Sequence, residues 1–240
     1  MHRLLVASEV LEQGSPALPP EAARHLKVLR PEPGEELELF DGRGGWRTFR
    51  YQRGGGLIPS SPRQSVPAPD RRLTLFACVT KGSRWDWTVE KATELGVTRI
   101  VPVISARTIV RIPAAEREAK RARWMRVAED AARQSDAKWL PEIVAAVDFA
   151  QSLELVRETT CLIGALTSPP SPPILSALPP GPLPSELAVY IGPEGDFTPE
   201  ELAVLLGIAR PVSFGPTVLR AETAAIFAVS VLSALRSGAN

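Results

Sequence analysis

The stretch YIGPEGDFT, residues 190–198, has the residue types and spacing best suited to binding a ligand. The apolar run before it, Glu186–Ile191, predicts a strand, and the turn that follows carries Gly192 and Gly195. Thr198 opens the T-x-x-E spacing of a capping box with proline at the first helical position, so a helix is expected to begin directly after the turn. Such strand–turn–helix units expose backbone groups where ligands bind in open α/β sheets. Taken alone, an ordinary strand-to-helix connection would look the same.

A second turn of the same kind follows in SFGPTVLRAETAAIFAVSVLSAL, residues 213–235. A short strand (211–214) ends at Gly215, and the next loop carries Arg220 and Glu222 before an almost wholly apolar helix. A helix that is apolar all round is expected to be buried. The arginine and the carboxylate could form only a salt bridge and a helix cap. Taken together, the two turns predict a single ligand pocket.

The motifs IGPEGDFTPEE and FGPTVLRAETA resemble the C-terminal motifs of the RsmE family, which methylates N3 of a uridine in bacterial 16S ribosomal RNA of the small subunit. KGSRWDWTVEKATELGVTRIVPVISART (81–108) is similar to the family's central motif, and HLKVLRPEPGEELELFDGRGG (25–45) to its N-terminal domain. The resemblance implies an α/β protein. Residues 1–70 would form a smaller PUA-like β-barrel that binds RNA. Residues 71–240 would form a SPOUT-type methyltransferase domain with a C-terminal trefoil knot.

The resemblance also implies S-adenosylmethionine as cofactor, and a homodimer in which one subunit's N-terminal domain presents RNA to the partner's pocket. The residues expected to bind the cofactor lie in three loops: Leu166, Thr167, Ile191, Gly192, Pro193, Glu194, Gly195, Phe214, Gly215, Val218, Leu219, Thr223 and Ala224. The expected catalytic residues are Arg220 and Glu222. Uridine N3 must lose a proton before it attacks a methyl carbon, and Arg220 could stabilise the charge that develops on the flanking carbonyl oxygens. Glu222 is the nearest candidate base, or it only holds Arg220 in place.

The net charge of +1 conceals two halves of opposite sign. Residues 1–138 contain 24 Lys and Arg against 17 Asp and Glu, a charge of +7, and residues 139–240 contain 4 against 10, a charge of −6. Basic surface attracts the phosphate backbone of nucleic acids. Residues 42–69 hold five arginines and no acidic residue, although a hairpin with solvated arginines and buried aromatics is the alternative. The residues expected to contact ribosomal RNA, free or in an assembled or assembling subunit, are Arg24, Lys27, Arg30, Arg43, Arg47, Arg50, Arg53, Lys81, Arg84, Lys91 and Gln134.

Three positions depart from the family pattern. Asp196 stands where the family usually has glycine, and it could contact the cofactor or cap the following helix. Arg133 and Ala137 stand where an acidic residue and an arginine are usual, and Lys138 could replace that arginine.

The cysteine and histidine content and the lengths of the apolar runs argue against a disulfide-linked protein, a metalloprotein and a membrane protein. Cys78 and Cys161 lie in apolar runs, which indicates buried thiols. With two cysteines and two histidines, we expect no metal site. No apolar run approaches the length of a membrane span, so a cytoplasmic protein is expected. The alternatives to the methyltransferase are a non-catalytic RNA-binding factor in ribosome assembly and a SPOUT enzyme that acts on another RNA.

Apolar runs and turn signals predict the remaining elements. Helices are expected over 20–30, over 83–95 with Gly96 as the stop, and over 113–134. Strands are expected over 72–79, 98–105 and, in the centre of the sheet, 159–166, with a parallel βαβ unit formed by the first two. The proline-rich stretch 167–184 is expected to be a stiff connection.

Overall fold

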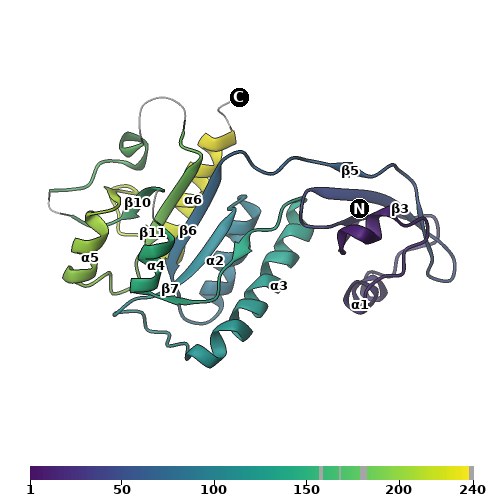
Figure 1. Ribbon diagram of the computed structural model, residues 1–240, viewed down its shortest axis with the longest axis horizontal. Coiled ribbons are helices and arrows are strands. Elements are labelled where there is room, and N and C mark those ends of the chain that lie inside the picture. The colour runs from purple at the N-terminus through teal and green to yellow at the C-terminus, as the bar shows by residue number, and fades with distance from the viewer. Residues whose placement is uncertain (157–158, 168, 179–182, 238–240) are drawn as a thin grey trace. The chain divides into compact units, whose positions relative to one another are not determined.

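The computed structural model describes residues 1–156, 159–167, 169–178 and 183–237 (Figure 1). The chain divides into two compact units. The N-terminal unit is Met1–Ala68 together with Glu129–Leu140, and the C-terminal unit is Pro69–Ala128 together with Pro141–Asn240. The sequence predicted a division near residue 70 but did not predict that a later segment joins the N-terminal unit.

The N-terminal unit is built on a five-stranded sheet of order β1-β2-β3-β4, with β5 also paired to β3. Its elements are β1 (His2–Leu5), η1 (Ser8–Glu12), α1 (Pro20–Leu29), β2 (Glu36–Phe40), β3 (Gly45–Tyr51), β4 (Leu57–Pro59) and β5 (Gln64–Ser65). β1 pairs in parallel with β2, and the other pairs are antiparallel. Alternate residues of β2 and β3, among them Leu37, Leu39 and Phe49, face a core closed by η1 and α1.

A buried cluster of charges holds Glu129–Leu140 within the N-terminal unit. Arg3 Nε donates to Glu38 Oε1 at 2.7 Å, and Arg3 Nη1 donates to the carbonyl oxygen of Ala132 at 2.6 Å. Lys138 Nζ lies 2.6 and 2.7 Å from the two oxygens of Glu38, and 2.8 Å from Asp136 Oδ1. Lys138 is therefore engaged in an ion pair inside the unit.

The C-terminal unit is built on a seven-stranded parallel sheet of order β12-β10-β11-β6-β7-β8, in which β9 also pairs with β7. Its strands are β6 (Arg72–Cys78), β7 (Arg99–Ile104), β8 (Glu142–Ile143), β9 (Val147–Asp148), β10 (Thr160–Gly164), β11 (Glu186–Ile191) and β12 (Arg210–Val212). Its helical elements are α2 (Ser83–Glu94), η2 (Ala114–Glu116), α3 (Arg117–Ser135), α4 (Phe149–Leu155), η3 (Ile174–Ala177), α5 (Pro199–Leu206) and α6 (Ala221–Ser237). The last residues of α3 belong to the N-terminal unit.

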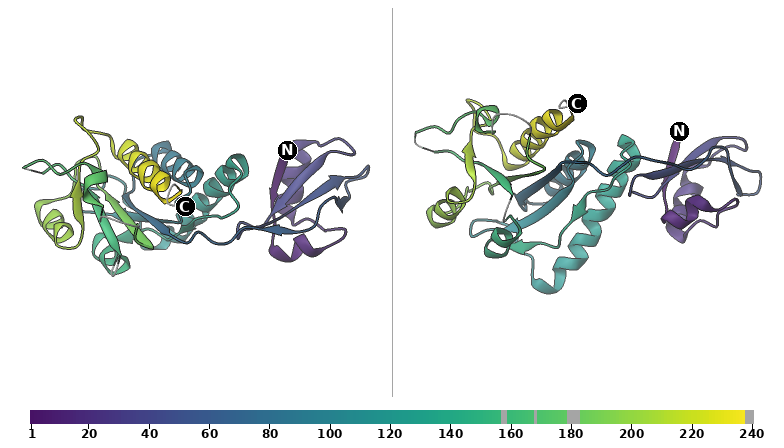
Figure 2. Two further views of the ribbon diagram at one scale, coloured as in Figure 1. Left: turned by 90° about the horizontal axis from the view of Figure 1, so that it is seen from above. Right: turned by 45° about the horizontal axis from the view of Figure 1, so that its top comes forward.

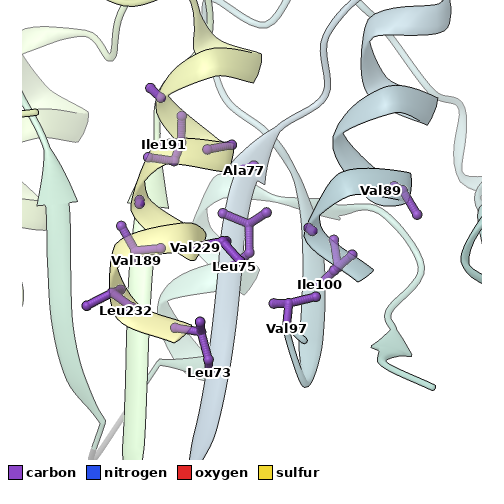
Figure 3. Packing of buried hydrophobic residues seen from close by; sticks show 14 of the residues in the cluster. Leu73, Leu75, Ala77, Val89, Val97, Ile100, Val189, Ile191, Val229 and Leu232 are labelled. Atoms are coloured by element: carbon purple, nitrogen blue, oxygen red, sulfur yellow. The ribbon is translucent and has the colours of Figure 1, made fainter. Parts of the chain in front are cut away.

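Helices cover both faces of this sheet, which explains why its strands read as continuous apolar runs. On one face Leu73 and Leu75 of β6 pack with α2 and with Val229 and Leu232 of α6 (Figure 3). α2 and α6 lie side by side there, as Figure 2 shows. On the other face Phe76 and Tyr190 stack with their ring centroids 4.5 Å apart, under α4 and α5.

Most of the predicted elements are confirmed. α1 and α2 match their predicted ranges within a residue or two, and Gly96 has the positive φ of 78° expected of a helix stop. β6, α2 and β7 form the predicted parallel βαβ unit. The predicted capping box at the start of α5 is present. The trefoil knot stays a prediction.

Other expectations were less accurate. The helix predicted from residue 113 begins as the short turn η2 and becomes α3 only at Arg117. β10 lies second from the edge of the main strand order, and β11 and β6 occupy its centre. The proline-rich connection contains η3, and its residues 168 and 179–182 lie outside the described residues. Among the residues described, no helix is long and apolar enough to cross a membrane.

The expectation that α6 is buried on all sides is wrong for the single chain. Thr223, Phe227, Ser230 and Ala234 are exposed, at a spacing that forms one stripe along the helix. Phe227 keeps 38% of its surface exposed. The buried face of α6, which includes Val229 and Leu232, packs on β6 and β11 of the sheet and beside α2.

Candidate active site

A cavity of about 330 Å³ lies at the carboxyl ends of β10, β11 and β12, beside the start of α6. Ligands bind at this edge of parallel sheets because the loops leaving the strands meet there. The lining residues are Gly164, Ala165, Leu166, Ile191, Gly192, Pro193, Glu194, Asp196, Val212, Ser213, Phe214, Gly215, Thr217, Val218, Leu219, Arg220, Ala221 and Ala224. The two glycine-containing turns thus share one pocket, as the sequence predicted.

The turn after β11 is held by short-range hydrogen bonds. The Asp196 N–H donates to the carbonyl oxygen of Pro193 at 2.9 Å, and Asp196 Oδ1 accepts from the Phe197 N–H at 2.8 Å. Thr198 Oγ1 then accepts from the Glu201 N–H at 3.2 Å, which caps α5. Asp196 has a φ of 59°, a left-handed conformation that aspartate tolerates better than most residues. Glycine adopts the same conformation without strain, so the turn can accommodate either residue at position 196.

The opposite wall depends on two glycines. A Cβ on Gly164 would lie 2.4 Å from Cε2 of Phe214, so the aromatic ring packs directly on the backbone of β10. Gly215 has a φ of 129°, and its N–H donates to Ser213 Oγ at 3.3 Å. A side chain at position 164 would displace the Phe214 ring, whereas a side chain at position 215 would meet no neighbour within 4 Å but would strain the backbone at this φ.

A second, shallower pocket shares Arg220 with the first. It is lined by Ser83, Arg84, Asp86, Trp87, Glu90, Arg220, Glu222 and Thr223, from the start of α2 and the start of α6. Glu222 is only 8% exposed, and within the described part of the chain its Oε2 has no hydrogen-bond partner. No ion pair joins Glu222 to Arg220 among the described residues. The structure therefore brings the two predicted catalytic residues to one pocket without pairing them.

Most of the predicted cofactor residues line the first cavity, but Thr167, Gly195 and Thr223 do not. Thr167 Oγ1 bonds to the carbonyl oxygen of Pro169 at 2.7 Å. The carbonyl oxygen of Gly195 accepts from Arg107 at 3.0 Å. Thr223 lines the second pocket. Asp196, which the sequence named as a residue that could contact the cofactor, also lines the cavity. The lining residues that sequence reasoning missed are Gly164, Ala165, Val212, Ser213, Thr217 and Ala221. All but Thr217 and Ala221 end or directly follow a strand, and the apolar runs could have identified them.

Several predicted RNA contacts have internal partners. Arg47 donates to the carbonyl oxygens of Ser61 and Leu11, each at 2.9 Å. Arg50 lies 3.5 Å from Glu36. Arg47 therefore supports the hairpin through internal hydrogen bonds instead of being solvated, as the alternative interpretation expected of the arginines. The buried ring of Phe49 does agree with that alternative.

Two predicted RNA contacts of the C-terminal unit, Arg84 and Lys91, also have internal partners. Arg84 lies 3.3 Å from Glu194, and Lys91 is bound to two glutamates of its own helix. Eight of the predicted RNA contacts are exposed: Arg24, Lys27, Arg30, Arg43, Arg50, Arg53, Lys81 and Gln134.

Both cysteines are buried free thiols, as predicted. Burial raises the pKa of Cys78 to about 11 and that of Cys161 to about 12. At neutral pH both side chains are thiols and act as small apolar groups.

Comparison with known proteins agrees with this geometry. Residues 67–233 match the RNA methyltransferase domain family, and residues 18–56 match the RNA methyltransferase PUA domain family. The ribosomal RNA small subunit methyltransferase E of Synechocystis sp. is 32% identical over 98% of this chain and 78% of its own length. The enzyme of that name from Mycobacterium bovis is 32% identical over 88% of this chain and 82% of its own.

Solved structures are similar over the whole chain. The ribosomal RNA small subunit methyltransferase E of Neisseria gonorrhoeae, solved with S-adenosyl methionine bound, has a TM-score of 0.85 and 28% identity, and the match covers 98% of each chain. A protein of Legionella pneumophila, solved with the cofactor SAM, has a TM-score of 0.85 and 31% identity over 98% of this chain and 97% of its own. With its N-terminal PUA domain and its SPOUT-like parallel-sheet domain, this chain belongs to the ribosomal RNA small subunit methyltransferase E family.

Proposed function

We propose that this protein transfers the methyl group of S-adenosylmethionine to N3 of a uridine in 16S ribosomal RNA. The observation that carries the proposal is the cavity where the ends of β10, β11 and β12 meet, with Arg220 on its border. Membership of the RsmE family supplies the class of substrate. The proposal is also supported by the pocket beside the cavity, lined by Trp87 and Glu222, where an acceptor base could lie.

The residues of the cavity fit S-adenosylmethionine by size and by charge. Its volume of about 330 Å³ lies in the range of small-molecule pockets. Glu194 and Asp196 are the acidic lining residues and Arg220 is the basic one, which suits a ligand that carries a sulfonium cation. Val212, Leu219 and their apolar neighbours would hold the adenine. When bound there, the cofactor supplies an electrophilic methyl group.

Arg220 would act on the uridine. It lines both pockets, so its guanidinium can reach a base in the second pocket from the side of the cofactor. As N3 loses its proton, negative charge spreads to the two flanking carbonyl oxygens, and a fixed cation stabilises that charge. Arg220 stays protonated and cannot serve as the base.

Glu222 would accept the N3 proton. Its buried Oε2 has a free acceptor position within the described residues, and no ion pair holds it to Arg220. These two features favour a proton acceptor over an anchor for the arginine.

We also propose a homodimer. The exposed stripe of α6, which presents Phe227 and Ala234 beside Thr223 and Ser230, is the surface that a second copy would cover. Light scattering at micromolar concentration measures the assembly, and a monomer would contradict the dimer.

The exposed cations Arg24, Lys27, Arg43 and Arg53 would contact RNA phosphates.

A single-turnover assay tests the proposed reaction. The substrate is 16S ribosomal RNA, free and in small subunits, from a strain that lacks the gene, and mass spectrometry of nucleosides detects 3-methyluridine. Arg220→Ala should lower the rate by about two to three orders of magnitude while S-adenosylmethionine affinity, measured by calorimetry, changes little. Arg220→Lys should recover only part of the rate, because lysine lacks the planar fork of arginine.

Two outcomes would contradict the proposal in different ways. A wild-type protein that binds RNA, but does not bind S-adenosylmethionine and does not methylate the RNA, would be a non-catalytic assembly factor. An Arg220→Ala protein with a normal rate and weak S-adenosylmethionine binding would make Arg220 a cofactor ligand.

A further inference from the structure

Trp87 is a large aromatic side chain without a role in the core. The buried residues of α2 are Trp85, Thr88, Val89 and their helical neighbours, which form the face packed on the sheet. Trp87 lies off that face and keeps 41% of its surface exposed. Tryptophan is enriched at binding interfaces, because the indole combines a large apolar surface with a hydrogen-bond donor.

The pocket beside Trp87 is lined by the carboxylate of Glu222, whose Oε2 is buried and has no hydrogen-bond partner among the described residues. Asp86 is paired with Arg123, and Glu90 lies 2.7 Å from Lys91 Nζ. Glu222, by contrast, is more than nine-tenths buried and has an Oε2 without a partner among the described residues. A buried, unsatisfied acceptor is costly, so a ligand that donates a hydrogen bond to it would be bound selectively.

Two arginines connect this pocket to the first cavity. Arg220 lines both pockets. Arg84 lines the second pocket and lies 3.3 Å from Glu194, which lines the first. A ligand in the second pocket therefore lies next to the proposed site of the methyl group.

We propose that the second pocket is the subsite for the acceptor nucleobase, with Trp87 as its stacking platform and Glu222 as the residue that selects uracil over cytosine. This inference rests on the proposed function, because that function identifies the first cavity as the source of the methyl group. Single-stranded bases are held by stacking on aromatic side chains and are read on their Watson–Crick edges. An enzyme that acts on a base extrudes it into a pocket of this kind.

The selection follows from hydrogen-bond chemistry. Uracil carries a hydrogen on N3 and donates it to the carboxylate of Glu222. Cytosine has a lone pair on N3, which faces the carboxylate and leaves Oε2 unsatisfied. A site that discriminates through a buried polar group rejects the wrong ligand more strongly than an apolar pocket does.

Binding of single nucleotides tests the inference without turnover. Uridine and cytidine 5′-monophosphate are titrated by ligand-detected NMR into the full chain saturated with S-adenosylhomocysteine, which has no methyl group to transfer. The wild type should bind the uridine nucleotide at least about fivefold more tightly. Trp87→Ala should weaken binding of both nucleotides by about 5- to 150-fold, because the stacking of one base is removed, and Trp87→Phe should retain most of the affinity.

Glu222→Gln tests the selection separately. An amide can present either a donor or an acceptor to the base, so the preference for uridine should fall close to one. Unchanged thermal midpoints and S-adenosylhomocysteine affinity show that each variant is folded.

Four results would overturn the inference: no detectable binding of the uridine nucleotide to the wild type, unchanged affinity in Trp87→Ala, an unchanged preference in Glu222→Gln, or a monomeric Trp87→Ala variant of a dimeric wild type. The last would make the indole a contact between subunits. If the wild type methylates ribosomal RNA in the same preparations, any of these results refutes only the nucleobase subsite. A wild type that does not methylate refutes the proposed function itself.

Discussion

Replacement of Glu38 by glutamine should strongly destabilise the N-terminal unit. The Glu38 side chain is 5% exposed, and its two cationic partners, Arg3 and Lys138, are 7% and 14% exposed. Glutamine keeps the shape but removes the only buried negative charge between them. Two desolvated cations would then face a neutral amide, and the only acidic group of the cluster left would be Asp136, which is 71% exposed.

The magnitude follows from the burial of the pair. Removal of one partner of a buried ion pair costs ~3–5 kcal/mol, because the other charge is left uncompensated. Asp136 offsets part of this cost, since it lies 3.2 Å from Arg3 and 2.8 Å from Lys138, so we expect a value near ~3 kcal/mol. For a domain of this size such a loss lowers the melting temperature by at least about 12 °C.

Glu36→Gln is the matched control. Glu36 lies two residues earlier on the same strand, and its pair with Arg50, at 3.5 Å, is about half exposed on both sides. A surface pair contributes at most ~1 kcal/mol. Calorimetry and urea unfolding of the full chain give both free energies of unfolding. If the two variants lose the same amount, the cluster does not stabilise the unit in the way that we infer.

Two further predictions concern thiols and RNA. Because burial raises the pKa of Cys78 to about 11 and that of Cys161 to about 12, neither should react with a thiol reagent at pH 8 until the chain unfolds. A fast-reacting thiol in the native protein would contradict this. Arg43→Gln together with Arg53→Gln should weaken RNA binding regardless of sequence and reduce its salt slope by about one for each phosphate that is no longer neutralised. An unchanged slope would show that these arginines only solvate the hairpin.

Local sequence patterns were sufficient to predict several of the helices and strands. The capping box after residue 198 and Gly96 with its positive φ act within a few residues of chain, so the sequence predicts them directly. The continuous apolar runs of β6 and β7 likewise indicate strands buried on both faces. The family, and with it the class of reaction, could be recognised from motifs that lie in these same segments.

The sequence predicted that the two turns share a pocket, but only the tertiary structure shows how the strand order builds it and which other residues meet. The order of β12, β10 and β11 brings three loops to one cavity, although β10 and β12 are separated by another strand in the chain. No pattern in the sequence near residues 129–140 predicts that this segment joins the N-terminal unit through Arg3. These contacts join residues far apart in sequence, and their free energy depends on the burial of both partners together, which no local pattern records.

For the same reason, side chains of one type can differ in their contacts and their exposure. Arg47 bonds two carbonyl oxygens, whereas Arg43, four residues earlier, is exposed. Glu222 was predicted beside Arg220, but its burial and its unpaired oxygen follow from the packing of α6 on the sheet and beside α2. The sequence by itself determined the elements and the chemistry that they could carry. Packing decided which charged groups are satisfied inside the protein and which remain available to a ligand.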